Sequence, residues 1–229
     1  MSSLHFFSSA LVAFCLAGTA AAQSNDSRVA LGVNAGTTGL GLQAQFKVSP
    51  KVTLRAGFDA LKFGAEVDGD AIVYDGELDF ATGGAFVDFH PTGGAFLLSA
   101  GAYFGSRELS VSGTPALGTT VEVGDEKFTS AQVGTLKGNL NFGDTAPFIG
   151  LGWDTTFTPR SRVGFKFIAG AAFGSAPDAT LLRSGGTQLS AAEQARFDRE
   201  LRDEEVEIEA KTDDFTMFPV VQVGLFVRF

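Results

Sequence analysis

Two residues with the chemistry of an acid/base pair lie close together in the chain, Asp88 and His90. An aspartate next to an imidazole can serve in general acid–base catalysis of the kind hydrolases use. Such a pair also needs a nucleophile, and the adjacent Pro-Thr-Gly-Gly turn offers no serine. We therefore expect Asp88 and His90 to belong to a network of hydrogen bonds and ion pairs with Arg55, and we expect no catalytic activity.

Two short acidic runs have the residue types that bind calcium, Asp68-Gly69-Asp70 and Asp75-Gly76-Glu77. Neither has the regular ligand spacing of a calcium loop, so exposed turns are the expectation. The Gly-Leu-Gly runs that begin at Gly39 and Gly150 are not continued by a phosphate-binding pattern. The sequence therefore predicts no metal site and no cofactor.

Composition excludes several classes of protein. The net charge of −9 argues against binding to nucleic acid or to anionic lipid surfaces. Hydrophobic residues make up 45% of the chain, yet beyond the N-terminal segment no apolar run reaches the length of about 18 residues that a membrane-spanning helix needs. A bundle of transmembrane helices is therefore excluded.

The N-terminal residues 1–22 have the pattern of a cleaved secretory signal. Residues 10–17 form a short apolar core, and Ala20-Ala21-Ala22 is a small-residue cleavage site before Gln23. The segment before the core lacks the usual Lys or Arg. The alternative is that Cys15, the single cysteine, is the lipid-modified cysteine of a lipoprotein signal, but the bulky Phe14 before it disfavours this. We expect an exported chain of residues 23–229 with no disulfide and no thiol chemistry.

Apolar residues alternate with other residues along much of the chain, most clearly in residues 215–229. Every second residue from Phe215 to Phe229 is apolar, while Gln222 and Arg228 lie between them. This is the pattern of a β-strand with two different faces. Seven earlier segments show the same period, so we expect strands at 29–36, 39–48, 51–63, up to 89, 96–104, up to 157, 163–173 and 215–229. The sixth changes phase, which predicts a bulge near residues 144–147.

Charged side chains in these strands fall on the faces opposite the apolar ones. The polar set is Lys47, Arg55, Asp59, Asp88, His90, Asp154, Arg162, Lys166 and Arg228. A Lys or Arg on the lipid face of a barrel costs about 2–4 kcal/mol at mid-bilayer, so this sorting predicts apolar faces toward lipid and a polar network in the lumen. A soluble, lipocalin-like barrel would reverse the faces and carry more charge on its polar side. The predicted fold is all-β, an eight-stranded antiparallel transmembrane β-barrel.

Loop lengths indicate how the barrel is oriented. The connections at 49–50, 91–94 and 158–161 are short, whereas long segments follow the third, fifth and seventh strands. Outer-membrane barrels have short periplasmic turns and longer outer loops. We expect a small hairpin within 119–133 and a charged helix over 191–210 that begins at a Ser190–Glu193 capping box. A solvated helix over the barrel mouth is favoured, and a surface that binds a partner or cations is the alternative.

Three runs resemble a family of uncharacterised proteobacterial outer-membrane barrel proteins: Asp-Phe-His-Pro-Thr-Gly-Gly at 88–94, Ala-Pro-Phe-Ile-Gly-Leu-Gly-Trp at 146–153, and Phe-Pro-Val-Val-Gln-Val-Gly at 218–224. The last strand resembles that of small, eight-stranded barrels of the OmpA and OmpX type. That resemblance implies a Gram-negative cell outer membrane, periplasmic chaperones, and an assembly machinery that reads the C-terminal aromatic, here Phe229. It covers most of residues 23–229 and implies no known activity.

An eight-stranded barrel has an interior just wide enough for side chains. We expect a structural or surface-interaction protein of the outer membrane, with lipid and lipopolysaccharide as partners and an external partner at the long loops. A narrow, porin-like channel for small or apolar solutes is the alternative. Its motivation is a mixed lumen in which five apolar residues lie beside the ions: Phe86, Leu97, Phe148, Ile168 and Phe226. A lipid-modifying enzyme is disfavoured because no nucleophile accompanies His90.

Overall fold

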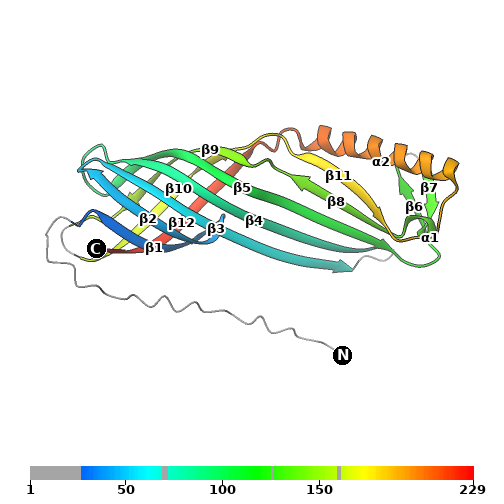
Figure 1. Cartoon of the computed structure of the whole chain (residues 1–229), viewed down its shortest axis with the longest axis horizontal. Helices are drawn as coiled ribbons and strands as arrows, with labels where there is room; N and C mark the ends of the chain where they lie inside the picture. Colours follow the sequence, from blue (N-terminus) through cyan, green and yellow to red (C-terminus); the bar gives the residue numbers. More distant parts are fainter. Residues whose placement is uncertain (1–26, 69–71, 125, 159–160) are drawn as a thin grey trace, which may run out of the picture.

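The computed structural model describes residues 27–68, 72–124, 126–158 and 161–229. The predicted signal at 1–22 and two residues of the Asp68-Gly69-Asp70 run, Gly69 and Asp70, lie outside these ranges. Eight antiparallel strands form a closed ring, because β1 pairs with β12 and the first half of β5 pairs with β9. This confirms the predicted fold class (Figure 1). In ring order the strands are β1 (Val29–Gly36), β2 (Gly39–Ser49), β3 (Val52–Asp68), β4 (Ile72–Phe89), β5 (Phe96–Pro115), β9 (Thr145–Asp154), β10 (Val163–Phe173) and β12 (Met217–Arg228).

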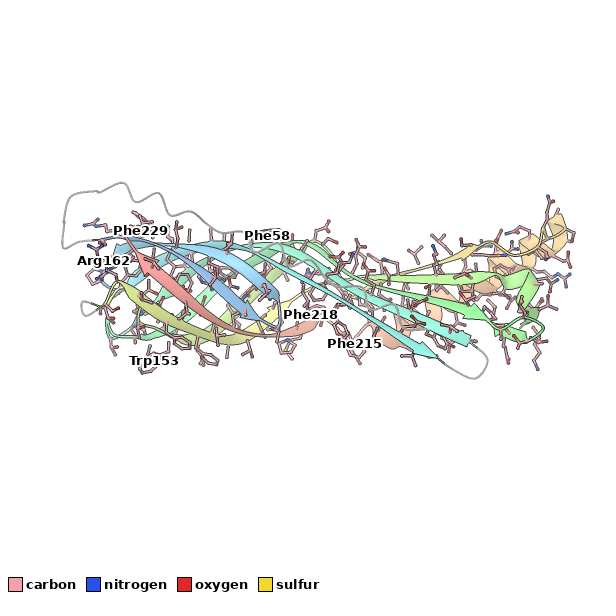
Figure 2. All side chains as sticks on the ribbon, turned by 90° about the horizontal axis from the view of Figure 1, so that it is seen from below. Phe58, Trp153, Arg162, Phe215, Phe218 and Phe229 are labelled. Atoms are coloured by element: carbon pink, nitrogen blue, oxygen red, sulfur yellow. The ribbon has the colours of Figure 1, made fainter. Side chains whose placement is uncertain are left out.

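The wall of the barrel is apolar on its outside. Side chains at every second position of the ring strands are exposed, as the alternation predicted. Trp153 and Phe58 illustrate this, since both point away from the lumen (Figure 2). Further members of this outer surface are Leu40, Leu42, Leu54, Val87, Ile149, Leu151, Val163, Val223 and Leu225. The lipocalin-like alternative is therefore wrong, because it requires these residues inside.

The lumen is filled by side chains. Phe86 makes edge-to-face contacts with the rings of Tyr103 and Phe148, at centroid distances of 4.9 and 5.5 Å. Phe226 is fully buried, and Gly32 makes room for it because a Cβ atom at Gly32 would lie 2.4 Å from the Phe226 ring. The barrel therefore has a packed interior of aromatic, aliphatic and polar side chains, as expected for eight strands.

The sheet continues beyond one end of the ring, because β3, β4 and β5 are longer than the other ring strands. Two further strands join this part of the sheet. β8 (Thr135–Asn141) pairs with the second half of β5, and β11 (Asp178–Ser184) pairs with β8. The acidic run Asp75-Gly76-Glu77, which we expected to be an exposed turn, lies within β4, and Asp68 is the last residue of β3. The predicted sixth strand is divided into β8 and β9, and the expected bulge is a break at 142–144, where Gly143 has a φ of 72°. The result is a five-stranded extension on one side of the barrel (Figure 1).

A small second core lies on this extension. It is built by the hairpin β6 (Thr120–Val123) and β7 (Glu126–Thr129), the short α1 (Ser130–Val133), and α2 (Ala191–Thr212). Its buried side chains are Val123, Phe128, Val133, Phe197 and Leu201. We call the extension with these elements the lobe. The predicted hairpin and helix are both present in it.

The helix α2 begins at the predicted capping box. The Ser190 side chain accepts a hydrogen bond from the Glu193 backbone, and the Glu193 carboxylate accepts bonds from Ser190 in return. These bonds lower the pKa of Glu193. The helix packs along β11 and the hairpin rather than over the barrel mouth, so the predicted placement was wrong (Figure 1).

The edge strand β11 explains this placement. The Glu205 carboxylate accepts a hydrogen bond from the Leu181 backbone N–H at 2.6 Å, and Glu209 accepts one from the Ala179 N–H at 3.1 Å. Exposed N–H groups at a sheet edge invite pairing with another strand, and these two glutamates satisfy them. The helix is thus held to the sheet by polar contacts as well as by Phe197 and Leu201.

The glutamate contacts make a specific prediction. We expect Glu205→Ala to destabilise the lobe by about 1–3 kcal/mol, the usual effect of leaving a part-buried donor unsatisfied. Hydrogen exchange at Leu181 should accelerate, while exchange in the ring strands should not change. Glu207→Ala is the matched control, because Glu207 forms only an exposed pair with Lys211. Equal effects of the two substitutions would contradict the proposed role of Glu205.

Candidate functional site

A buried ionic cluster lies in the lumen around Asp88. Its carboxylate accepts hydrogen bonds from Arg55 Nε at 3.2 Å and from Ser99 Oγ at 2.6 Å, and it forms an ion pair with Lys166. Lys166 also pairs with Asp154 at 3.1 Å. The Arg55 guanidinium lies 3.9 Å from the centre of the Phe86 ring. These groups come from β3, β4, β5, β9 and β10, so the cluster ties five of the eight ring strands together.

A second polar cluster lies in the lumen around Asp59. Asn34 Nδ2 donates to Asp59 Oδ1 at 2.5 Å, and Gln222 Nε2 donates to Asp59 Oδ2 at 3.1 Å. Gln222 also donates to Thr38 at 2.6 Å and accepts from Gln43 at 3.3 Å. This cluster links β1, β2, β3 and β12, where the first and last strands meet.

The other candidate residues from the sequence lie near the short turns. His90 places Nδ1 2.9 Å from the Gly94 carbonyl oxygen, within the β4–β5 turn. Lys47 lies over the Phe157 ring, and the Arg228 guanidinium donates to the Thr158 carbonyl. Arg162 is exposed at the end of the barrel (Figure 2). The structure thus brings together Arg55, Asp88, Asp154 and Lys166, with Asp59 in a separate cluster.

Sequence reasoning missed several members of these clusters, among them Ser99, Asn34 and Gln43. Each occupies a lumen-facing position of the two-residue alternation, so the signal was a polar or amphipathic residue in the phase of the charged set. All three are buried. Their partners are residues distant in the sequence, which the alternation does not specify.

The arrangement in the lumen has the chemistry of a structural network. Each carboxylate in it faces cations or amides that hydrogen-bond to it, as buried charges require. Among the described residues, no group of three or more His, Cys, Asp or Glu is placed to hold a metal ion. In the same described ranges, no helix combines the length and apolar character needed to cross a membrane.

The two faces of the sheet exchange polarity where the extension leaves the ring. Cross-strand register aligns an outer row of Lys62, Asp79, Glu108, Asn141 and Asp178. The neighbouring inner row consists of Phe63, Leu78, Leu109, Leu140 and Ala179. On the ring the outside is apolar, whereas on the extension the outside is polar and includes the exposed Lys62–Glu77 pair at 2.5 Å.

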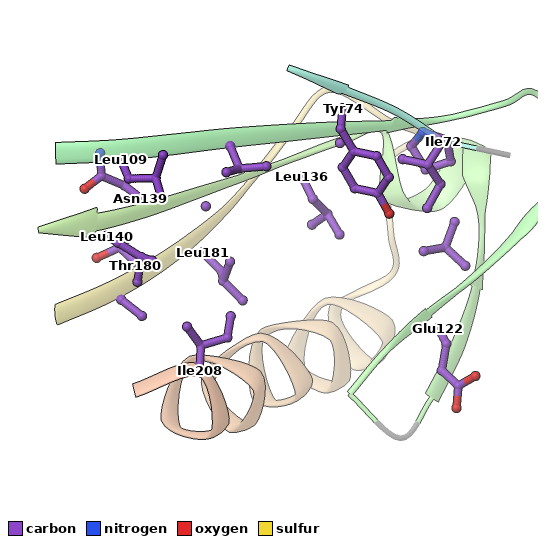
Figure 3. A pocket seen from close by; sticks show the side chains of 16 residues that line it. Ile72, Tyr74, Leu109, Glu122, Leu136, Asn139, Leu140, Thr180, Leu181 and Ile208 are labelled. Carbon is purple, nitrogen blue, oxygen red and sulfur yellow. The ribbon is translucent and has the colours of Figure 1, made fainter. Parts of the chain in front are cut away.

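A pocket lies between the apolar inner face of the extension and α2. Its volume is about 340 Å³, within the range of ligand-binding cavities. Tyr74, Leu109, Leu136 and Leu181 line it from the sheet, and Ile208 lines it from α2 (Figure 3). Sequence reasoning did not anticipate this pocket.

Comparison with solved structures identifies two barrels from Acinetobacter baumannii. CarO2 has a TM-score of 0.58 and 22% identity, with 89% of this chain and 99% of that chain covered. CarO has a TM-score of 0.57 and 20% identity, with 90% of this chain and 100% of that chain covered. The chain shares the fold of these two β-barrels. No protein-family model and no curated protein sequence matches it.

Proposed function

We propose that this chain is an integral outer-membrane protein whose closed barrel anchors the lobe at the cell surface, where the lobe interacts with an external partner. The exchange of polarity between ring and extension is the observation that carries the proposal. An apolar outer wall suits lipid, and a polar outer wall suits water. The switch at Lys62 and Asp79 marks the level at which the chain leaves the bilayer.

The lengths of the connections support the same orientation. Short turns join β2 to β3, β4 to β5 and β9 to β10 at the end of the ring opposite the lobe. Short turns are periplasmic in outer-membrane barrels, which supports a lobe on the outside of the cell. A cleaved signal at 1–22 and assembly through the C-terminal Phe229 are parts of this proposal.

A closed barrel is preferred to a narrow channel because the lumen is packed. Phe86, Tyr103 and Phe148 occupy its apolar part, and the Asp88 cluster spans its polar part. We expect no steady single-channel currents when the purified protein is inserted into planar bilayers. Reproducible conductance steps that are absent from protein-free controls would support the channel instead.

Surface labelling tests the orientation directly. The only cysteine, Cys15, lies in the predicted signal. The exported protein without an added cysteine should therefore show little labelling. Ser112→Cys on the outer face of the lobe should react with a membrane-impermeant maleimide in intact cells. Ser161→Cys, in the exposed turn before β10, should react only after the outer membrane is permeabilised. The opposite result would contradict the proposed orientation, and the unsubstituted chain is the control.

A further inference from the structure

The inner face of the extension is apolar across all five strands. One cross-strand row contains Ala65, Gly76, Val111, Gly138 and Leu181, and the next contains Val67, Tyr74, Gly113 and Leu136 before it ends at Arg183. The side covered by α2 and the hairpin forms the second core. The side formed by β3 and β4 is open, with Phe63 and Val67 each exposing more than 60% of their surface.

The pocket lies where the covered side meets the open side. Tyr74 and Val111 line it and are partly exposed, so the apolar surface continues from the interior of the pocket toward Val67. The polar residues that line it include Glu122 on the hairpin, Asn139 on β8 and Thr180 on β11 (Figure 3). A ligand would therefore meet an apolar wall with a few polar groups, one of them a carboxylate.

We propose that this pocket is a binding site for an apolar small molecule that carries no negative charge. The volume of about 340 Å³ accommodates a molecule with two or three fused or linked rings, or a short hydrocarbon chain. Burial of apolar surface supplies the attraction. The segment that contributes β11 and α2 disfavours anions, because residues 178–214 contain eleven acidic and five basic residues. This inference rests on the proposed function, which presents the lobe to the outside.

A tryptophan placed in the pocket provides a local reporter of probe binding. Trp153, the only tryptophan, lies on the lipid-facing wall and is removed by Trp153→Phe. Tyr74→Trp then introduces a single indole at the pocket. The full-length barrel is placed in nanodiscs and titrated with N-phenylnaphthylamine, a neutral probe that quenches indole fluorescence by energy transfer. We expect saturable quenching, and about tenfold weaker binding or less of its sulfonated, anionic analogue.

Filling the pocket provides the decisive variant. A Cβ atom at Gly113 would make ordinary contacts with Tyr74 and Ile72 at 3.4 and 3.5 Å, so Gly113→Leu adds volume without a clash with the backbone. It should weaken binding of the probe by about tenfold or more, because the added side chain competes for the same space. Ser112→Leu adds a similar side chain to the opposite face of β5 and should leave binding unchanged.

The outcomes separate this inference from the proposed function. A shift in gel mobility on boiling shows for each variant that the barrel is folded. A folded barrel whose indole is not saturably quenched overturns the inference and leaves the outer-membrane proposal intact. Equal affinity in Gly113→Leu and Ser112→Leu, or equal binding of the anionic analogue, also overturns it. A chain that forms no barrel overturns the proposed function itself.

Discussion

Replacing Asp88 by alanine is expected to lower the free energy of unfolding by about 3–5 kcal/mol, because it leaves buried cations without their counter-charge. Arg55 and Lys166 both pair with this carboxylate, and all three side chains are almost fully buried. Lys166 would keep its ion pair with Asp154, whereas Arg55 would lose its ion pair and keep neutral contacts such as those with Ser99 and the Phe86 ring. Urea unfolding of the protein in lipid vesicles measures the change.

Asp79→Ala is the matched control, since Asp79 lies on the same strand and also pairs with a lysine. Its partner Lys62 is exposed, and such pairs contribute about 0–1 kcal/mol. Combining Asp88→Leu with Arg55→Met should recover much of the lost stability, because it leaves Lys166 paired with Asp154 and because an apolar replacement of a buried ion pair is often close to neutral. Equal effects of Asp88→Ala and Asp79→Ala would show that the lumen is hydrated and not packed.

Placing a lysine on the apolar wall is expected to have the second-largest effect. Val223 lies in the middle of β12 and points outward between neighbours on β1 and β10. Val223→Lys should destabilise the folded protein in vesicles by about 2–4 kcal/mol, the depth-dependent cost of a cation at mid-bilayer. The folded fraction in the outer membrane should fall accordingly.

Val206→Lys is the control for this substitution, because Val206 is exposed on α2 in the lobe. A surface change of that kind should alter stability by no more than about 0.5 kcal/mol. If both lysines were tolerated equally, the wall around Val223 would face water, and the assignment of the bilayer to the ring would be wrong.

The eight ring strands could be predicted because each keeps a two-residue period over the part that lies in the ring. Within each such segment, charged residues and apolar residues point to opposite faces of the strand. A shift of one residue would move every side chain to the other face, so the pattern fixes which face is apolar. The sequence alone could therefore assign the lumen-facing and outward-facing side chains. The capping box at Ser190 also depends on residues close together in the sequence, Ser190 and Glu193, and the start of α2 was therefore predicted correctly.

The extension was missed, although β3 carries a signal for it. Apolar residues occupy the positions of Val52, Leu54 and Phe58, and then change phase so that Phe63 and Val67 continue the pattern. The β3–β4 register runs through this point without a shift. The change of phase therefore marks a change of surroundings and not a bulge or the end of the strand.

The placement of α2 and the pairing of the lumen charges depend on contacts between distant segments. Glu205 and Glu209 reach the edge of β11 from the following helix, and a charged helix alone does not specify which edge it covers. The alternation of the sequence predicts that the Lys166 side chain lies in the lumen. That Lys166 pairs with Asp88 and Asp154 depends on the stagger of the strands in the closed ring, which is the shear of the barrel. The alternation within one strand carries no information about this stagger.

The most direct test of the central claim is the electrophoretic mobility of the protein from the outer-membrane fraction, with and without boiling. A closed barrel with a packed lumen resists unfolding by cold SDS, so we expect a faster band before boiling and a shift to the unfolded position afterwards. A chain recovered from the soluble periplasmic fraction, with the same mobility under both conditions, would contradict the membrane barrel.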